Sequence, residues 1–152
     1  MADGPFPALV FVHGFTGFAL AYMNLLTEVA SHGYVVIAAD EPLTNRNAPG
    51  GPFMLDVRNQ PGDVSFLTGQ AARLNVVGPL AGMVDGERVG VGGHSLGAIT
   101  TLMATYNTCC ADDRIDAAIA LAGAAVFGPP EGRWFRGSGA PLLMVHGEDD
   151  PL

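Results

Sequence analysis

The sequence predicts an α/β fold in which a mostly parallel sheet is flanked by helices on both faces. Short, unbroken apolar runs recur along the chain, and such runs are typical of strands buried on both sides. Between these runs lie segments whose apolar residues repeat at helical spacing. Because strands and helices alternate, successive strands are expected to be joined by helical crossovers, which makes them parallel.

Five apolar runs have the pattern of buried strands. The first, residues 8–12, is continuous and ends at a His-Gly pair. The pair Asp85-Gly86 predicts a turn before the third run. The other four runs are residues 34–39, 88–93, 115–122 and 142–146.

Three segments between these strands have helical spacing. Gly33 is expected to end the first helix, and Pro61 is expected to open the second. The residues predicted to share a face are Tyr22, Leu25, Leu26 and Val29 in the first, Val64, Leu67, Ala71 and Leu74 in the second, and Leu96, Ile99, Leu102, Met103 and Tyr106 in the third.

The composition excludes several classes of protein. The chain has 152 residues, which suits one domain, and its 49% hydrophobic and 14% charged residues exclude a disordered chain. The formal net charge is −8 and lysine is absent, so the acidic surface would repel phosphate backbones and no nucleic-acid partner is expected. The longest apolar run, residues 117–127, is too short to span a membrane.

Neither the cysteines nor the first residues assign a compartment. Adjacent cysteines such as Cys109 and Cys110 rarely pair with each other, so no disulfide is expected between them. Residues 1–5 have neither the cationic segment nor the apolar core of a signal peptide.

The strongest functional signal follows the third predicted strand. Gly93-His94-Ser95-Leu96-Gly97 fits the pattern G-x-S-x-G and lies between a predicted strand and a predicted helix. The glycines permit a sharp turn that exposes the serine hydroxyl near the positive end of the helix. In a parallel sheet, ligands bind beyond the carboxyl ends of the strands, where this turn lies. We therefore interpret Ser95 as a nucleophile.

A second signal is the glycine-rich turn at residues 13–17, after the first strand. Acyl transfer requires two backbone N–H donors at the developing oxyanion, one from the residue after the nucleophile and one from a neighbouring loop. The main-chain nitrogens of Phe15 and Leu96 are the candidates for this oxyanion hole. His13 and Gly14 are expected to support the turn.

A third signal is the acidic segment at residues 146–150, directly after the last predicted strand. A carboxylate at this edge of the sheet can orient an imidazole and stabilise its charged form, which is the role of the third member of a catalytic triad. The position of the segment favours this interpretation over an ordinary solvated turn.

These three motifs, in this order, resemble the α/β-hydrolase superfamily. Within it the chain is similar to bacterial lipases and cutinase-like polyester hydrolases, together with dienelactone hydrolase and platelet-activating-factor acetylhydrolase relatives. The resemblance covers residues 1–152 as a single hydrolase core domain and implies hydrolysis of carboxylic esters through an acyl-enzyme. It implies Ser95 as nucleophile, Phe15 and Leu96 as oxyanion donors, and Asp150 as the acid, with Asp149 as the runner-up. No metal and no cofactor are implied.

The resemblance also implies a catalytic histidine that this sequence does not contain. In the family that histidine follows one further strand, whereas this sequence ends at Leu152, and further strands usually precede the one that ends at His13. The chain is therefore expected to be an incomplete hydrolase core that lacks the first strands and the C-terminal strand with its histidine loop.

None of the four histidines present is expected to replace the missing one. His13 is expected to be structural, the His94 side chain to leave the turn in a different direction from that of Ser95, and His32 to lie near solvent at a helix end. His146 lies two strands from Ser95, which corresponds to roughly 10 Å before side-chain reach.

Two alternative functions remain open. The chain can be a non-catalytic fragment or binding remnant of this fold, or it can be a peptidase or thioesterase, because the fold alone does not select the acyl group. The expected partner is a small-molecule or polymeric ester, and unpaired sheet edges predict self-association. Members of the resembled family are often secreted, but the sequence does not assign a compartment.

Overall fold

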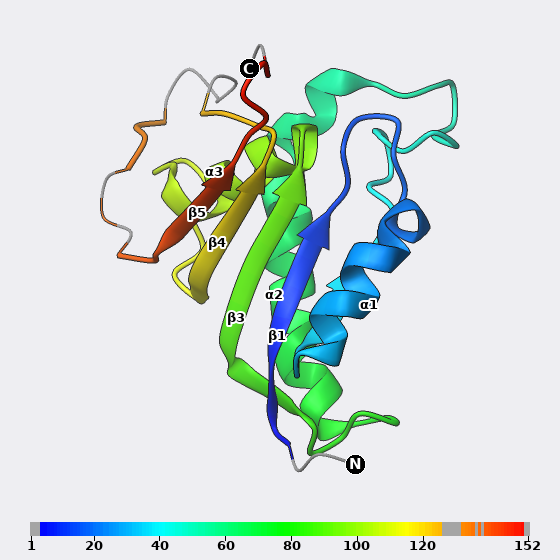
Figure 1. The fold of residues 1–152 in the computed structure, drawn as a ribbon, viewed down its shortest axis with the longest axis vertical. Helices are drawn as coiled ribbons and strands as arrows, with labels where there is room; N and C mark the ends of the chain where they lie inside the picture. The colour runs from blue at the N-terminus through cyan, green and yellow to red at the C-terminus, as the bar shows by residue number, and fades with distance from the viewer. Residues whose placement is uncertain (1–3, 126–131, 136, 138, 151–152) are drawn as a thin grey trace.

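The computed structural model contains a five-stranded sheet with the strand order β2-β1-β3-β4-β5. Figure 1 shows β1, β3, β4 and β5 side by side. The structure describes residues 4–125, 132–135, 137 and 139–150. Every neighbouring pair of these strands is parallel, which confirms the predicted fold class. The strands are β1 (Phe6–Val12), β2 (Val35–Ala38), β3 (Val84–His94), β4 (Ile115–Leu121) and β5 (Leu142–Val145).

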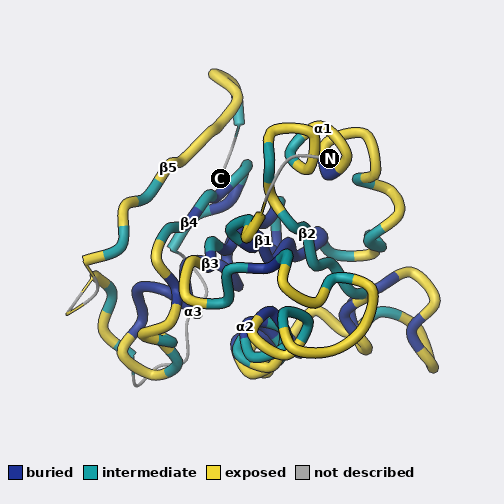
Figure 2. Tube along the Cα trace, turned by 90° about the horizontal axis from the view of Figure 1, so that it is seen from below, coloured by how far each residue is buried: buried dark blue, intermediate teal, exposed yellow. Residues whose placement is uncertain are grey.

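Helices cover both faces of the sheet, as predicted. One face carries α1 (Met23–Ser31), and the other carries α2 (Gln60–Val76) and α3 (Leu96–Tyr106) (Figure 2). Two short 3₁₀ helices, η1 (Ala19–Tyr22) and η2 (Met54–Arg58), come before α1 and α2. Within the described residues, no helix is long and apolar enough to cross a membrane.

The core lies between the two central strands and the helices α2 and α3. The strands β1 and β3 each have a neighbour on both sides, and all residues of α3 are buried. Val12 at the end of β1 pairs with Gly93 near the end of β3, so the two strand ends lie side by side. The buried residues of the main cluster are Ala8, Val10, Val12, Val64, Ala71, Val84, Val89, Val91, Ala104 and Ile115.

Two local expectations are wrong. The predicted turn at Asp85-Gly86 lies inside β3, where the pairing with β1 shifts: Pro7 pairs with Asp85, but Ala8 pairs with Val89. Residues 86–88 of β3 have no partner in β1 and form a local irregularity, after which the pairing with β1 resumes. The chain therefore continues in the same direction and does not turn there. Cys109 and Cys110 form a disulfide, in a turn after α3 whose backbone N–H groups are held by Asn107.

The edge strand β5 exposes apolar side chains. Leu143, Met144 and Val145 are each more than two-fifths exposed. Exposed apolar edge strands are templates for pairing with another chain. The expected self-association stays a prediction, and β5 is one of the two sheet edges, with β2, that could take part in it.

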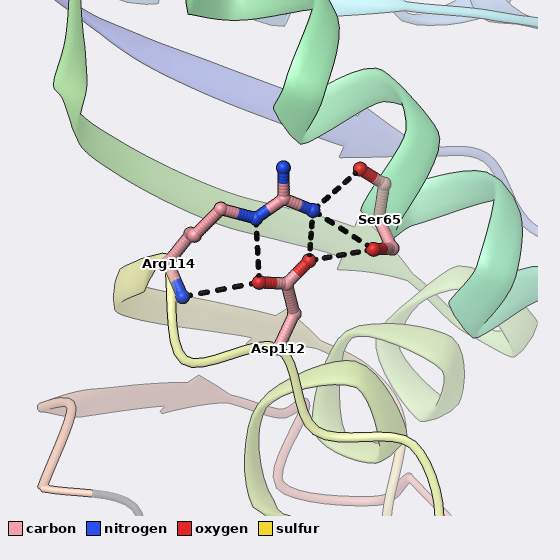
Figure 3. Close-up of polar contacts among 3 residues, drawn as sticks. All are labelled: Ser65, Asp112 and Arg114. Carbon is pink, nitrogen blue, oxygen red and sulfur yellow. Dashed lines mark hydrogen bonds and ion pairs between the residues drawn. The ribbon is translucent and has the colours of Figure 1, made fainter.

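A polar cluster connects α2 to the segment before β4 (Figure 3). The Arg114 guanidinium donates from Nε and Nη2 to the two carboxylate oxygens of Asp112, at 2.9 and 2.5 Å. Arg114 Nη2 also donates to the backbone oxygen of Ser65 at 2.9 Å, and the Ser65 hydroxyl donates to Asp112 at 2.7 Å. The hydrogen bond from Arg114 holds the pKa of Asp112 well below its usual range.

Replacing Asp112 with alanine should lower the free energy of unfolding by about 1 kcal/mol at pH 7, since the ion pair is partly exposed. Because folding lowers the pKa of Asp112, its contribution is present above about pH 4 and is lost as the pH falls further. Urea unfolding of the wild type, Asp112→Ala and the exposed neighbour control Asp113→Ala measures this effect. Equal losses in the two variants would contradict it.

Candidate active site

Ser95 occupies a strained turn between β3 and α3. Its backbone has φ 53° and ψ −115°, a conformation that non-glycine residues rarely adopt. Hydrogen bonds hold the turn on both sides: Ser95 N donates to Leu121 O on β4 at 2.8 Å, and Ser95 O accepts from Ala98 N at 3.0 Å. The surrounding structure therefore holds the serine in a conformation that its own preferences disfavour.

Close backbone approach explains the two glycines around Ser95. A Cβ atom on Gly97 would overlap the backbone oxygen of Val12, and a Cβ atom on Gly93 would overlap the backbone oxygen of Gly97. The first turn of α3 thus packs directly against the ends of β1 and β3. A side chain at either position would push the helix away from the sheet and move Ser95.

The turn at residues 13–17 adjoins the turn at Ser95, as the sequence predicts. Gly14 is buried, and a Cβ atom placed on it would lie 3.3 Å from Ser95 Cβ. The Phe15 side chain packs against the cluster that contains Leu96. Neither the N–H of Phe15 nor the N–H of Leu96 donates a hydrogen bond to another described residue. The residue after Gly14 and the residue after Ser95 therefore each have a backbone N–H without a partner among the described residues.

A series of buried hydrogen bonds connects the turn at residues 13–17 to α2 and α3. Thr16 N donates to Thr44 O at 2.8 Å, and the Thr44 hydroxyl accepts from Gln60 Nε2 at 2.7 Å. The Gln60 carbonyl oxygen accepts in turn from the hydroxyl of Thr100 on α3. Thr44, Gln60 and Thr100 are fully buried, so each of these bonds replaces water that the groups have lost. Because Gln60 belongs to α2 and Thr100 to α3, these hydrogen bonds link the turn to both helices on that face of the sheet.

The histidines at the turns have partners other than Ser95. His13 is buried; its Nδ1 donates to Gly14 O at 2.8 Å and its Nε2 accepts from Glu41 N at 2.9 Å, so it connects the turn to the backbone at Glu41. His94 Nδ1 contacts the Tyr22 hydroxyl at 2.9 Å.

The other two histidines also lie away from the serine hydroxyl. His32 is exposed at the end of α1 and contacts the backbone oxygen of Glu28. His146 follows β5, where Nε2 contacts Gly123 O at 2.9 Å and Nδ1 lies 3.6 Å from a carboxylate oxygen of Asp150. None of the four histidines forms a hydrogen bond with Ser95 Oγ within the described part of the chain.

The acidic candidates lie at the carboxyl edge of the sheet but do not contact Ser95. Asp150 lies near His146, and β4 separates their strand from β3. Asp149 is exposed. Asp40, at the end of β2, accepts a hydrogen bond from Ala19 N at 2.7 Å and so anchors η1. In the ranges that the structure describes, no group of three or more His, Cys, Asp or Glu residues could hold a metal ion.

Glu41 is an unexpected buried carboxyl behind the turn. It is 2% exposed, and its Oε2 has no hydrogen-bond partner among the described residues. Burial raises the pKa of Glu41 to about 8, and the nearby carboxylates of Asp63 and Asp56 add to the rise. The group is therefore mostly protonated at pH 7, while its backbone N–H holds His13.

Sequence reasoning does not find three of these supporting residues. Tyr22 is predicted to be part of an apolar helix face, whereas its hydroxyl contacts both turns. Glu41 lies in the loop after β2 and Gln60 is the first residue of α2, and neither belongs to a recognisable sequence motif. The available signal is the group of threonines in a largely apolar helix, Thr100, Thr101 and Thr105, which predicts buried hydrogen-bond partners without singling out Thr100.

The sheet order, the helices on both faces and the strand–turn–helix at Ser95 define an α/β-hydrolase, which confirms the resemblance at that level. The chain belongs to the Chlorophyllase family, whose model matches residues 1–125. Its structure is similar to that of a ferulic acid esterase from Streptomyces cinnamoneus, with 31% sequence identity and a TM-score of 0.59. That match covers 94% of this chain and 43% of the esterase, so the chain spans less than half of that protein. No curated protein matches the chain significantly.

The stability of the fold should fall as the pH rises from about 4.5 to about 8. Folding raises the pKa of Glu41 across this range, so the folded state holds a proton that the unfolded state has lost. The raised pKa of Asp63 acts in the same direction. Urea unfolding between pH 5 and pH 9 should show a smaller decline in Glu41→Gln than in the wild type and in the exposed control Glu28→Gln. The same decline in all three proteins would show that Glu41 is not the group responsible.

Proposed function

We propose that this chain provides the nucleophile and the oxyanion-binding site of a carboxylic ester hydrolase that works through an acyl-enzyme. The observation that carries the proposal is the strained turn at Ser95 packed against the turn at Gly14, with unpaired N–H groups at Phe15 and Leu96. A partly exposed serine beside two such donors suits acyl transfer. The esterase named above and the family of the chain support the choice of an ester as substrate.

In this mechanism Ser95 Oγ attacks the carbonyl carbon of the ester and loses its proton to a general base. The carbonyl oxygen becomes an oxyanion that accepts hydrogen bonds from Phe15 N–H and Leu96 N–H. When the tetrahedral intermediate collapses, the bond to the alcohol oxygen breaks, the alcohol leaves with the proton, and the acyl group stays on Ser95. Water then attacks the acyl-enzyme by the reverse steps and releases the carboxylic acid.

The proposed acid is Asp150, which would orient the imidazole of the general base. Its present neighbour is His146, but the ring of His146 contacts Gly123 O and lies two strands from β3. His146 is therefore not proposed as the base. A chain in which no histidine reaches Ser95 can also be a non-catalytic relative of this fold, which is the second candidate function.

Apolar side chains near the turn support an ester with an apolar portion. Leu43 and Phe53 are 42% and 55% exposed, and Phe53 N donates to Leu43 O at 2.7 Å. The next residue, Thr44, holds Thr16 of the oxyanion turn. The exposed pair therefore adjoins the proposed oxyanion site, where an acyl or alcohol group could pack. Both small-molecule and polymeric esters remain candidates.

A fluorophosphonate should label Ser95 and leave the other serines, Ser31, Ser65 and Ser138, unmodified. Labelling requires only one attack by Ser95 Oγ on the phosphorus and no turnover, and the phosphoryl oxygen would occupy the oxyanion site. Mass spectrometry of peptides locates the adduct, and heat denaturation before labelling is the control for nonspecific reaction. Labelling at another serine, or equal labelling after denaturation, would overturn the assignment of Ser95.

The 152-residue chain should hydrolyse p-nitrophenyl butyrate no more than marginally faster than its Ser95→Ala variant. The members of a triad act as a unit, so a serine without a base loses most of its advantage. The measurement is the initial rate of p-nitrophenolate release by the wild type, Ser95→Ala and His146→Ala. Robust turnover that both substitutions abolish would identify His146 as the general base and refute this expectation.

A further inference from the structure

The hydroxyl of Tyr22 touches both turns of the proposed site. It accepts a hydrogen bond from Gly14 N at 3.1 Å and lies 2.9 Å from His94 Nδ1. Gly14 directly precedes Phe15, and His94 directly precedes Ser95. The Tyr22 side chain therefore connects Gly14, which precedes the proposed oxyanion donor Phe15, to His94, which precedes Ser95.

The Tyr22 ring is fixed in a position that directs its hydroxyl toward this junction. Its centroid lies 4.9 Å from that of Phe11 on β1 and 5.7 Å from that of the His94 ring. Tyr22 is half-buried at the end of η1, and Asp40 anchors the start of η1. The hydroxyl is thus held by ring contacts with residues of β1 and β3 and by the anchored helix η1.

A neutral His94 ring with its proton on Nε2 allows every hydrogen bond at this junction to form. The hydroxyl oxygen accepts from Gly14 N–H, and its single proton is then available to an acceptor. An unprotonated Nδ1 of a neutral His94 ring is that acceptor, with the ring proton on Nε2. In this pattern Gly14 N–H, the tyrosine hydroxyl and His94 form a continuous chain across the two turns.

We propose that Tyr22 is a positioning residue that sets the distance between the oxyanion turn and the Ser95 turn. The inference rests on the proposed function and deepens it. Without the hydroxyl, Gly14 N–H loses its acceptor while Gly14 O keeps its hydrogen bonds to His13 Nδ1 and Gly17 N, and the following N–H of Phe15 is less precisely aimed at the oxyanion. Donors must lie within hydrogen-bond distance of the oxyanion itself, so small shifts of this turn lower the rate of the chemical step.

The test compares the wild type with Tyr22→Phe, which keeps the ring and removes the hydroxyl. Tyr34→Phe is the matched control, because Tyr34 is 45% exposed and lies away from both turns. The reaction is single-turnover phosphonylation of Ser95 by a p-nitrophenyl alkylphosphonate, followed by p-nitrophenolate release and checked by mass spectrometry. Tyr22→Phe should lower the maximal rate constant by about tenfold with little change in the half-saturating concentration.

Amide hydrogen exchange provides a second measurement that does not depend on reactivity. Exchange at Gly14 N–H should be at least about tenfold faster in Tyr22→Phe, with the change confined to residues 13–17. Unchanged exchange at Gly14, or faster exchange throughout the chain, would overturn the proposal, as would an effect on the half-saturating concentration alone. If the adduct forms at a serine other than Ser95, the proposed function fails, and Gly14 exchange still decides whether Tyr22 holds the turn.

Discussion

The site depends on one steric constraint, the direct contact between the first turn of α3 and the ends of β1 and β3. Gly93 and Gly97 permit this contact because any Cβ atom at these positions would overlap backbone atoms. The contact forces the chain to reverse within one residue, and Ser95 takes the positive φ that this reversal requires. The conformational cost is met by the burial of α3 and by hydrogen bonds on both sides of the turn.

The turn at residues 13–17, the proposed oxyanion site, is supported by polar groups rather than by apolar packing alone. His13 holds it to the backbone of Glu41, the chain from Thr44 through Gln60 to Thr100 holds it to two helices, and Tyr22 holds it to the serine turn. Buried hydrogen bonds are directional, so they specify the position of a backbone N–H more narrowly than apolar contacts do. The supports come from both sides of the turn, which suits a site that must present two donors to one oxygen.

The sequence predicts well those features that are encoded locally. The apolar runs place all five strands, and Gly33 and Pro61 fall at the helix boundaries expected of them. The G-x-S-x-G pattern finds the turn at Ser95 because its glycines are needed for close contact. The irregularity at Asp85 depends on the register with β1, and the contacts of Tyr22 and Glu41 join residues far apart in the chain. No local pattern records such pairings, so they emerge only from the structure.

The most direct test of the account is a crystal structure of the chain after reaction with a p-nitrophenyl alkylphosphonate. We expect the phosphorus to be bonded to Ser95 Oγ. One phosphoryl oxygen should lie about 2.7–3.1 Å from both Phe15 N and Leu96 N. An adduct on Ser95 whose oxygens point away from these two nitrogens would contradict the oxyanion site. An adduct on any other serine would contradict the account as a whole.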